Sequence, residues 1–488
     1  MQRLNKKNRI IKGAIFLFIG KILNVILAVV QILLIPRLLG PKSMGFYSFW
    51  LSVYFITARI LGLGGQQIII KYVPELRIKN ELMIPTLLKK VVNIKFPLFF
   101  IIICLGLLFW STEPSYFIII VSASLLFSLN LAAESVFYSY NIMGTYALIS
   151  LIRTALRIIL VLILFYAFYK TGIVVGILGA PLIALSLSIF LLSRLLPRNH
   201  VALDQPFRKN FNFGFWIYLS IVIHGMVTWL IIILSKIYIK DIAIIGYFGV
   251  GVQLFLNIGM LVYFINESIL PSLVEFRLIN DNKFKSSLRL AWKYTNILLF
   301  PTVLGGYVLT GPMVLFIIGE NYIPGTTIIR LFFLPIIFMS WIKFHTQILF
   351  VYKKKIAIFL TELINLLIFV GTWFYLICQK NIDITPLSLC LGTLAAYLFI
   401  LIHSNQIIKI EKYFSNFLKP LIASSLMAFI LNLFKVNSII QLLSLVLLGF
   451  LLYVLFLFLL KGIGKADFKL IKEFLKSTKI FRVEEQGF

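Results

Sequence analysis

The sequence predicts an all-α polytopic membrane protein with about 14 transmembrane helices. Its composition is 61% hydrophobic with a mean hydropathy of +1.01, whereas soluble proteins are about 45–50% apolar. Fourteen apolar stretches can be marked, and about 20 apolar residues suffice to cross a bilayer. Of the 46 Lys and Arg, 33 fall on one side of this map, either in the connections or within the five end residues of the stretches next to them; 7 fall in the alternate connections, and the remaining 6 lie inside the stretches. This bias predicts a multi-pass protein of the cytoplasmic (inner) membrane with both termini in the cytoplasm.

The apolar stretches follow one another with short polar connections. They cover residues 13–35, 45–66, 91–110, 116–137, 146–168, 173–195, 213–235, 242–271, 294–318, 326–350, 356–377, 385–403, 418–434 and 437–460. Every connection on the predicted outer side is short. The longest polar segments, 71–90, 196–212 and 272–293, are predicted to face the cytoplasm.

Charge and motifs exclude several function classes. The formal net charge of +29 follows from the positive-inside distribution and from attraction to anionic lipid, so nucleic-acid binding is not expected. The three cysteines, Cys104, Cys378 and Cys390, form no C-x-x-C pair, so we expect no metal site. The sequence contains no G-x-x-x-x-G-K-[ST], G-x-S-x-G or H-E-x-x-H motif, and we expect a protein that is not an enzyme.

A weak internal repeat predicts two lobes. Pro36-Arg37 precedes Gly45-Phe46-Tyr47, and Ser235-Lys236 precedes Gly246-Tyr247-Phe248, with 201 positions between Gly45 and Gly246. Because six spans return the chain to the same side, the repeat is parallel. We predict an N-lobe of six helices (1–195), a cytoplasmic linker (196–212), a six-helix C-lobe (213–403), a C-terminal helix pair (404–460) and a basic tail (461–488). Chance similarity of Gly-aromatic turns is the alternative.

The tail has the pattern of an amphipathic helix on the inner leaflet. Phe468, Ile471, Phe474 and Leu475 fall on one face, and lysines surround the other. A disordered basic tail is the alternative.

Two polar stripes run along the first two spans. Lys21, Asn24 and Gln31 share one face of the first span, and Ser48, Ser52 and Arg59 share one face of the second. A Lys or Arg at mid-bilayer costs about 2.5–3.5 kcal/mol or more. The stripes therefore predict a water-filled cavity between helices.

The first 77 residues also carry a family resemblance. Pro36-Arg37-Leu38-Leu39-Gly40-Pro41, Gly45-Phe46-Tyr47-Ser48, Leu61-Gly62-Leu63-Gly64 and Lys71-Tyr72-Val73-Pro74-Glu75 closely resemble the Wzx-type O-antigen flippases. These belong to the multidrug/oligosaccharidyl-lipid/polysaccharide (MOP) exporter superfamily. The resemblance implies fourteen helices in two six-helix lobes with a final pair. It also implies transport of undecaprenyl-diphosphate-linked oligosaccharide across the inner membrane by alternating access.

Four cationic residues inside the first lobe are the candidate headgroup-binding set. Lys21, Arg59, Arg153 and Arg157, with Asn24 and Gln31 beside them, are placed to bind an anionic headgroup, and guanidinium forks match phosphate geometry. Snorkelling of the long side chains to the interface is the alternative, as is pairing of one arginine with Glu134.

Three intramembrane carboxylates are candidates for coupling or gating. Glu134, Glu267 and Glu362 lie within apolar stretches, where a carboxylate can bind a coupling proton or Na⁺; no other cofactor is expected. Structural ion pairing is an equal reading for Glu134. A solvated or gate-forming role is favoured over ion coupling for Glu267, which precedes Pro271 near the cytoplasmic end of its stretch.

The sequence therefore favours a lipid-linked oligosaccharide flippase that works as a monomer in the membrane, beside a polysaccharide polymerase or export complex. A drug exporter of the same superfamily is the rival, although its cationic substrates suit a basic cavity poorly. A polysaccharide polymerase or ligase is less favoured, because such enzymes typically carry a large external loop. A polytopic envelope scaffold would not need the buried charges.

Overall fold

The structure is a computed structural model that describes residues 2–109, 113–197, 201, 211–279, 281–408, 415–464 and 467. Every regular element within these ranges is a helix. The predicted amphipathic tail segment after Asp467 lies outside the described residues.

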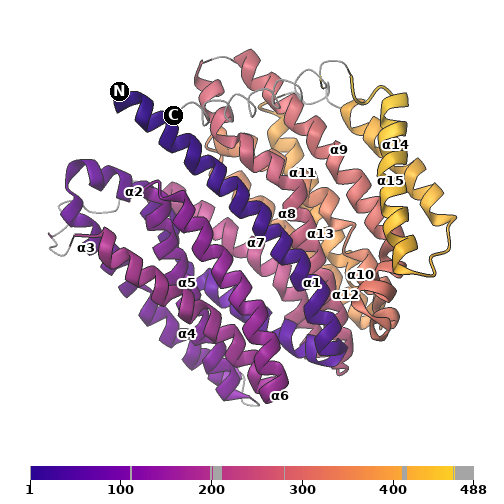
Figure 1. Ribbon diagram of the computed structural model, residues 1–488, viewed down its shortest axis with the longest axis horizontal. Helices are drawn as coiled ribbons and strands as arrows, with labels where there is room; N and C mark the ends of the chain where they lie inside the picture. The colour runs from indigo at the N-terminus through magenta and orange to yellow at the C-terminus, as the bar shows by residue number, and fades with distance from the viewer. Residues whose placement is uncertain are drawn as a thin grey trace, which may run out of the picture.

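The helices pack side by side along one common direction (Figure 1). Their bounds are α1 Gln2–Gly62, α2 Gly65–Lys79, η1 Glu81–Met83, α3 Ile84–Asn93, α4 Lys95–Phe109, α5 Pro114–Ser139, α6 Met143–Leu195, α7 Phe211–Tyr238, α8 Ile242–Ile279, α9 Asp281–Met313, the π-helical turn η3 Val314–Ile318, η4 Glu320–Gly325, α10 Thr326–Leu331, α11 Pro335–Val351, α12 Lys355–Cys378, η5 Ile382–Ile384, α13 Leu387–Asn405, α14 Ser415–Asn432 and α15 Ile439–Leu459.

The predicted number of spans is confirmed within the described ranges. Eleven helical segments are long and apolar enough to cross a membrane. Two of them contain a break: α1 at Gly40, with φ 72° and ψ 168°, and α6 at Tyr169, with φ 54° and ψ −125°. The left-handed φ at Gly40 suits a residue without a Cβ. The eleven segments, the two extra halves that these breaks create, and the shorter apolar helix α14 make fourteen.

Two groups of helices and a flanking pair form the bundle. Helices α2 to α6 occupy one side and α7 to α13 the other (Figure 1). Helix α1 packs against α5 and α6 of its own lobe and against α7 and α8 of the other. The predicted all-α fold with two six-helix lobes is therefore confirmed, and α1 forms the seam between the lobes. The exact lobe boundaries stay a prediction.

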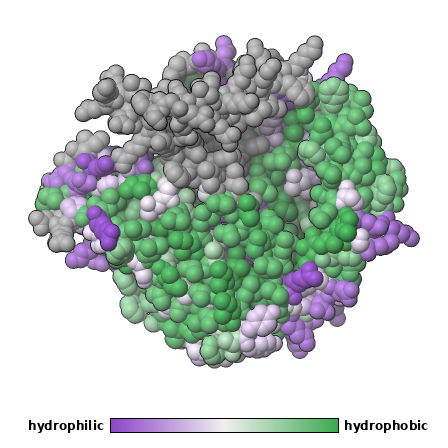
Figure 2. All heavy atoms as spheres, viewed as in Figure 1, coloured by the Kyte–Doolittle hydropathy of each residue, from purple (hydrophilic) through white to green (hydrophobic). Residues whose placement is uncertain are grey.

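The surface is that of a membrane protein. Figure 2 shows apolar residues over most of the visible middle of the molecule, with hydrophilic residues at the left edge and the lower right. Helix α15 alone exposes Ile440, Leu447, Phe450 and Phe458, each 60% or more accessible. An apolar face of this extent is unfavourable in water and suited to lipid, so the protein is a multi-pass membrane protein.

The lobes meet through a reciprocal glycine contact. A Cβ on Gly45 would lie 2.1 Å from the Ile242 carbonyl oxygen, and a Cβ on Gly246 would lie 2.1 Å from the Pro41 carbonyl oxygen. Pro41 and Ile242 are 201 positions apart, as are Gly45 and Gly246. Contacts that repeat when the partners are exchanged are the mark of a twofold axis. This pseudo-axis therefore passes between the two glycines.

The C-terminal helix pair packs against the C-lobe. Helices α14 and α15 pack against α9, and the Tyr453 hydroxyl donates to the Ile297 carbonyl oxygen at 2.7 Å. Beyond α15, the Asp467 carboxylate accepts hydrogen bonds from Lys293 Nζ at 2.6 Å, the Tyr294 hydroxyl at 2.8 Å and the Gly464 N–H at 2.8 Å. The start of the tail is thus fixed to α9.

Candidate functional site

The polar stripe of the first span lies against both lobes. A Cβ on Gly20 would come within 2.6 Å of the Ala147 Cβ, so α1 approaches α6 closely at this level. Asn24 is half-buried, and its amide donates to the Gly20 carbonyl oxygen at 3.1 Å. Gln31, two turns further along, is only 6% exposed. The side chain of Lys21 lies outside the described set.

Arg157 connects to this stripe and, through it, to the C-lobe. Its Nη2 donates to Gln31 Oε1 at 3.0 Å, and Gln31 Nε2 donates to Gln253 Oε1 on α8 at 3.3 Å. The Tyr47 hydroxyl lies 3.4 Å from Gln31 Nε2, and the Arg157 guanidinium lies 5.4 Å from the Phe55 ring centroid. A cation, two amides and two aromatic rings therefore meet where α1, α6 and α8 come together.

Arg153, one turn before Arg157, has a different environment. It forms a hydrogen-bonded ion pair with Glu134 of α5, and both side chains are largely buried. With its amide oriented to satisfy both ends, Asn130 also donates to Glu134 Oε1 at 3.0 Å. The pairing is the alternative that the sequence left open for Glu134. Arg153 is thus neutralised by a carboxylate, whereas the hydrogen-bond partner described for Arg157 is a neutral amide.

A second group of ionisable residues lies in the C-lobe, between α7 and α12, and Arg59 of α1 approaches α7 next to it. His224 Nδ1 lies 3.2 Å from Glu362 Oε2 of α12, and Lys343 of α11 acts electrostatically on both. The aliphatic part of Arg59 packs against Gly225, with Cγ 3.2 Å from the position of a Cβ, and the Tyr218 hydroxyl donates to the Ile60 carbonyl oxygen at 2.8 Å. The structure therefore pairs Glu362 with His224 inside the C-lobe and packs Arg59 of α1 beside Gly225, the chain neighbour of His224; sequence spacing predicted neither contact.

Lys95 is a buried cation that sequence reasoning missed. It opens α4, is 2% exposed, and donates to the Ser128 hydroxyl at 2.5 Å and to the Ser128 carbonyl oxygen at 3.2 Å. The candidate gating residue Glu267 lies in α8, but its side chain is outside the described set. The structure therefore brings Gln31, Arg157 and Gln253 together, and keeps the Arg153–Glu134 pair and the His224–Glu362 pair as separate groups.

A known protein family matches the part of the chain that forms this arrangement. The model of the family described as polysaccharide biosynthesis protein matches residues 10–277. This is more than half of the chain and includes most of α1, all of α6 and most of α8. The chain belongs to the polysaccharide biosynthesis protein family. A comparison with curated proteins found no match to the chain.

Solved structures place this family member in the MOP transporter fold. It is similar to a lipid II flippase MurJ in an inward closed conformation, with a TM-score of 0.69, 18% identity, and coverage of 91% of this chain and 98% of that one. It is also similar to an inward-facing MATE family multidrug resistance transporter of the MOP superfamily, with a TM-score of 0.60, 14% identity, and coverage of 80% of this chain and 94% of that one. A third similar structure, a MOP superfamily transporter from Pyrococcus furiosus, has a TM-score of 0.52 and 12% identity, with coverage of 83% of this chain and 96% of that one. At these identities the similarity shows the fold, which confirms the predicted architecture.

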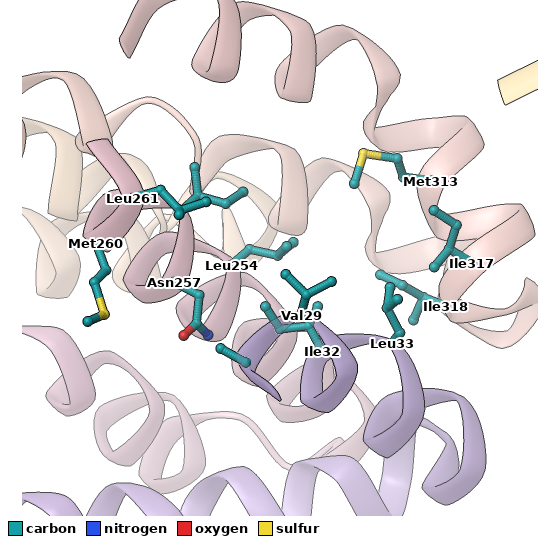
Figure 3. A pocket seen from close by; sticks show the side chains of 12 residues that line it. Val29, Ile32, Leu33, Leu254, Asn257, Met260, Leu261, Met313, Ile317 and Ile318 are labelled. Carbon is teal, nitrogen blue, oxygen red and sulfur yellow. The ribbon is translucent and has the colours of Figure 1, made fainter. Parts of the chain in front are cut away.

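The polysaccharide-family chain also has an apolar pocket on the α1–α8 seam. A cavity of about 150 Å³ lies between α1, α8, the end of α9 and η3. Its lining residues are Ala28, Val29, Ile32, Leu33, Leu254, Asn257, Ile258, Met260, Leu261, Met313, Ile317 and Ile318. Figure 3 shows Val29 and Ile32 of α1 facing Leu254 and Asn257 of α8 across it. Two of the lining residues, Val29 and Leu261, are 44% and 41% exposed, so the pocket is open at one side. The seam therefore carries a polar bridge and an apolar pocket at the same level, because Gln31 and Gln253 are chain neighbours of Ile32 and Leu254.

Proposed function

We propose that the protein translocates undecaprenyl-diphosphate-linked oligosaccharide across the cytoplasmic membrane by alternating access, for the synthesis of a cell-surface polysaccharide. Membership of the polysaccharide biosynthesis family and the MOP fold support this proposal. The substrate class comes from the resemblance of residues 10–77 to O-antigen flippases and from the chemistry of the seam.

The observation that carries the proposal is the environment of Arg157. Its guanidinium lies between the lobes, with a neutral amide as its described hydrogen-bond partner. A cation within the membrane is costly and is retained where it binds something. A diphosphate offers several anionic oxygens and forms strong charge-assisted hydrogen bonds with a guanidinium. Arg59 and Lys21 lie on the same polar stripes of α1 and are proposed to extend this surface.

The apolar pocket supports the lipid part of the substrate. A lipid-linked glycan has a polar headgroup and a long prenyl chain, which must occupy different environments at once. The Arg157 side of the α1–α8 seam suits the diphosphate, and the apolar pocket beside it suits a segment of prenyl chain. Rocking of one lobe against the other would then expose the headgroup to the opposite side.

Coupling is proposed to use the buried carboxylates. Glu362 with His224 of α7 is the first candidate for a coupling proton or Na⁺, because α7 packs against α1 and Gly225, the chain neighbour of His224, contacts Arg59. Glu134, paired with Arg153 inside the N-lobe, is the second. Glu267 remains a proposed gate residue. We propose that a monomer carries out this cycle, next to a polymerase or export complex.

Arg157→Ala tests the function, and Arg194→Ala is its matched control. Arg194 lies in the last turn of the same helix and stacks on Phe190 at 4.4 Å. Loss of a hydrogen bond to a charged group costs about 1.5–3 kcal/mol, so we expect glycan export to fall about 10- to 150-fold in Arg157→Ala and to stay normal in Arg194→Ala. Arg157→Lys keeps the charge without the planar fork and should retain part of the activity.

The decisive measurement is the membrane face on which the lipid-linked intermediate accumulates in Arg157→Ala. Accumulation on the cytoplasmic face, with protein level unchanged, supports translocation. Accumulation on the external face would show a polymerase or ligase instead. Normal glycan export combined with altered drug resistance would show a drug exporter.

A further inference from the structure

The hydrogen-bonded chain Arg157–Gln31–Gln253 crosses from one lobe to the other. It passes from α6 through α1 to α8, with steps of 3.0 and 3.3 Å. We infer that this chain is a latch: it holds the lobes together while the site is empty, and a phosphoryl anion releases it by replacing Gln31 as the partner of Arg157. This inference rests on the proposed function for the source of the anion.

The direction of the hydrogen bonds makes Gln31 the movable part. Its Oε1 accepts from Arg157, and its Nε2 donates onward to Gln253. An amide whose oxygen is polarised by a cation becomes a stronger donor at its nitrogen, since hydrogen bonds in a chain reinforce one another. The hold on Gln253 in the C-lobe therefore depends on whether Arg157 is still bonded to Gln31.

Two donors beside Gln31 lack an acceptor in the described structure. Arg157 Nε and Gln253 Nε2 are both buried, and neither has a hydrogen-bond partner there. Buried donors are normally satisfied. One donor belongs to each lobe, and both flank the amide that joins them. Arg157 Nε and Nη2 belong to one guanidinium, so an acceptor with several oxygens can engage both at once, whereas Gln31 accepts only from Nη2.

A phosphoryl group meets that need better than an amide does. It carries negative charge and several acceptor oxygens, and charge-assisted hydrogen bonds are roughly twice as strong as neutral ones. Once it occupies Arg157, Gln31 loses the partner that polarises it, and the bond to Gln253 weakens. The lobes are then free to separate only when a headgroup is bound, so an empty transporter does not cycle.

The first test needs no ligand. In a variant whose three native cysteines are replaced, spin labels at Ser115→Cys of the N-lobe and Asn381→Cys of the C-lobe report the separation of the lobes in nanodiscs; both positions are exposed. Gln253→Leu should raise the population of longer distances at least about five-fold, the usual lower bound of such couplings. Gln31→Met should do the same.

Gln347→Leu is the matched control. It makes the same chemical change at another buried glutamine, 7% exposed, in α11, which packs against α8, α9 and α13. It should keep the wild-type distances. The latch is refuted if both Gln253→Leu and Gln31→Met match wild type while remaining folded, or if Gln347→Leu shifts the distances equally.

The second test supplies the anion. Inorganic pyrophosphate or a prenyl diphosphate added to the wild type should shift the distances toward those of Gln253→Leu, and Arg157→Gln should abolish the shift. By reciprocity, Gln31→Met, which breaks the chain but keeps Arg157, should bind the anion at least about five-fold more tightly. A lower half-saturating concentration for the prenyl diphosphate identifies a lipid headgroup as the source, and an equal one identifies a soluble phosphate. No shift with either anion overturns the anion trigger.

The two proposals fail in different ways. If the flippase function is wrong, Arg157→Ala exports glycan normally while the ligand-free distances still respond to Gln253→Leu. If the latch is wrong, export still depends on Arg157 while the distances in Gln253→Leu stay those of the wild type.

Discussion

Adding a single carbon at Gly45 tests the contact between the lobes. A Cβ there lies 2.1 Å from the Ile242 carbonyl oxygen, whereas ordinary contact begins at 3.4 Å. The obstacle is backbone, which no rotamer change relieves, so Gly45→Ala must move α1 and α8 apart by about 1.3 Å. Overpacking of this kind costs about 1–3 kcal/mol. The balance between closed and separated lobes should shift by about 5- to 150-fold.

The Ser115 and Asn381 spin-label pair measures this shift. Gly45→Ala should lengthen the distance at the end of the bundle predicted to face outward, and Gly246→Ala should do the same because its contact is reciprocal. The double variant should add little, since separation caused by one alanine relieves the clash of the other. Gly371→Ala is the control, because a Cβ there meets nothing within 4 Å. If Gly45→Ala and Gly371→Ala give the same distances and the same thermal stability, the reasoning is wrong.

Three further predictions concern pairing, pH and topology. Glu134→Gln leaves the buried Arg153 without its carboxylate and should lower the free energy of unfolding by about 3–5 kcal/mol. Chemical denaturation should detect this loss, and a smaller loss in the double variant Glu134→Gln/Arg153→Gln would attribute it to the ion pair. Burial raises the pKa of Asp467, but hydrogen bonds from Gly464, Lys293 and Tyr294 outweigh this and hold that pKa below its ordinary value. The Asp467 carboxylate should therefore hold the start of the tail on α9 fully above about pH 4, and this stabilisation should be lost as the pH falls further. A rate of tail proteolysis that does not change with pH would contradict this. A cysteine at Asn80 should react with an impermeant maleimide only after permeabilisation and one at Ser115 without it; the reverse result would overturn the predicted topology.

Hydropathy predicted the fold because the membrane limits the choices. Backbone polar groups must be satisfied inside each span, so long apolar stretches can only be helices. Helical spacing likewise placed Gln31 on the polar stripe of the first span. It could not identify Gln253 as its partner, because 222 positions separate the two in the chain and only the docking of α1 on α8 joins them.

The burial of Lys95 could not be predicted from the sequence. In the sequence Lys95 counted among the basic residues of the cytoplasmic side, because it lies near the start of the apolar stretch 91–110. The residues before it form η1 and α3, and the amine is buried against Ser128 of α5. Similarly, Glu362 and His224 were each recognisable as intramembrane polar residues, but their pairing depends on how α7 packs against α12. Charge and periodicity reveal which residues are costly to bury, and the packing of helices decides which of them meet.

The reciprocal glycine contact also has a consequence for ancestry. If the two lobes are fused copies of one six-span subunit, Gly45 and Gly246 descend from a single residue that faced itself across the axis of a homodimer. The polar bridge does not share this symmetry: the counterpart of Gln31 is Ile232, and that of Gln253 is Ser52, both fully buried. Duplication would thus have preserved the symmetric contact that joins the halves while allowing one of the two equivalent seams to become polar. A substrate with one charged end and one apolar end needs only one such seam.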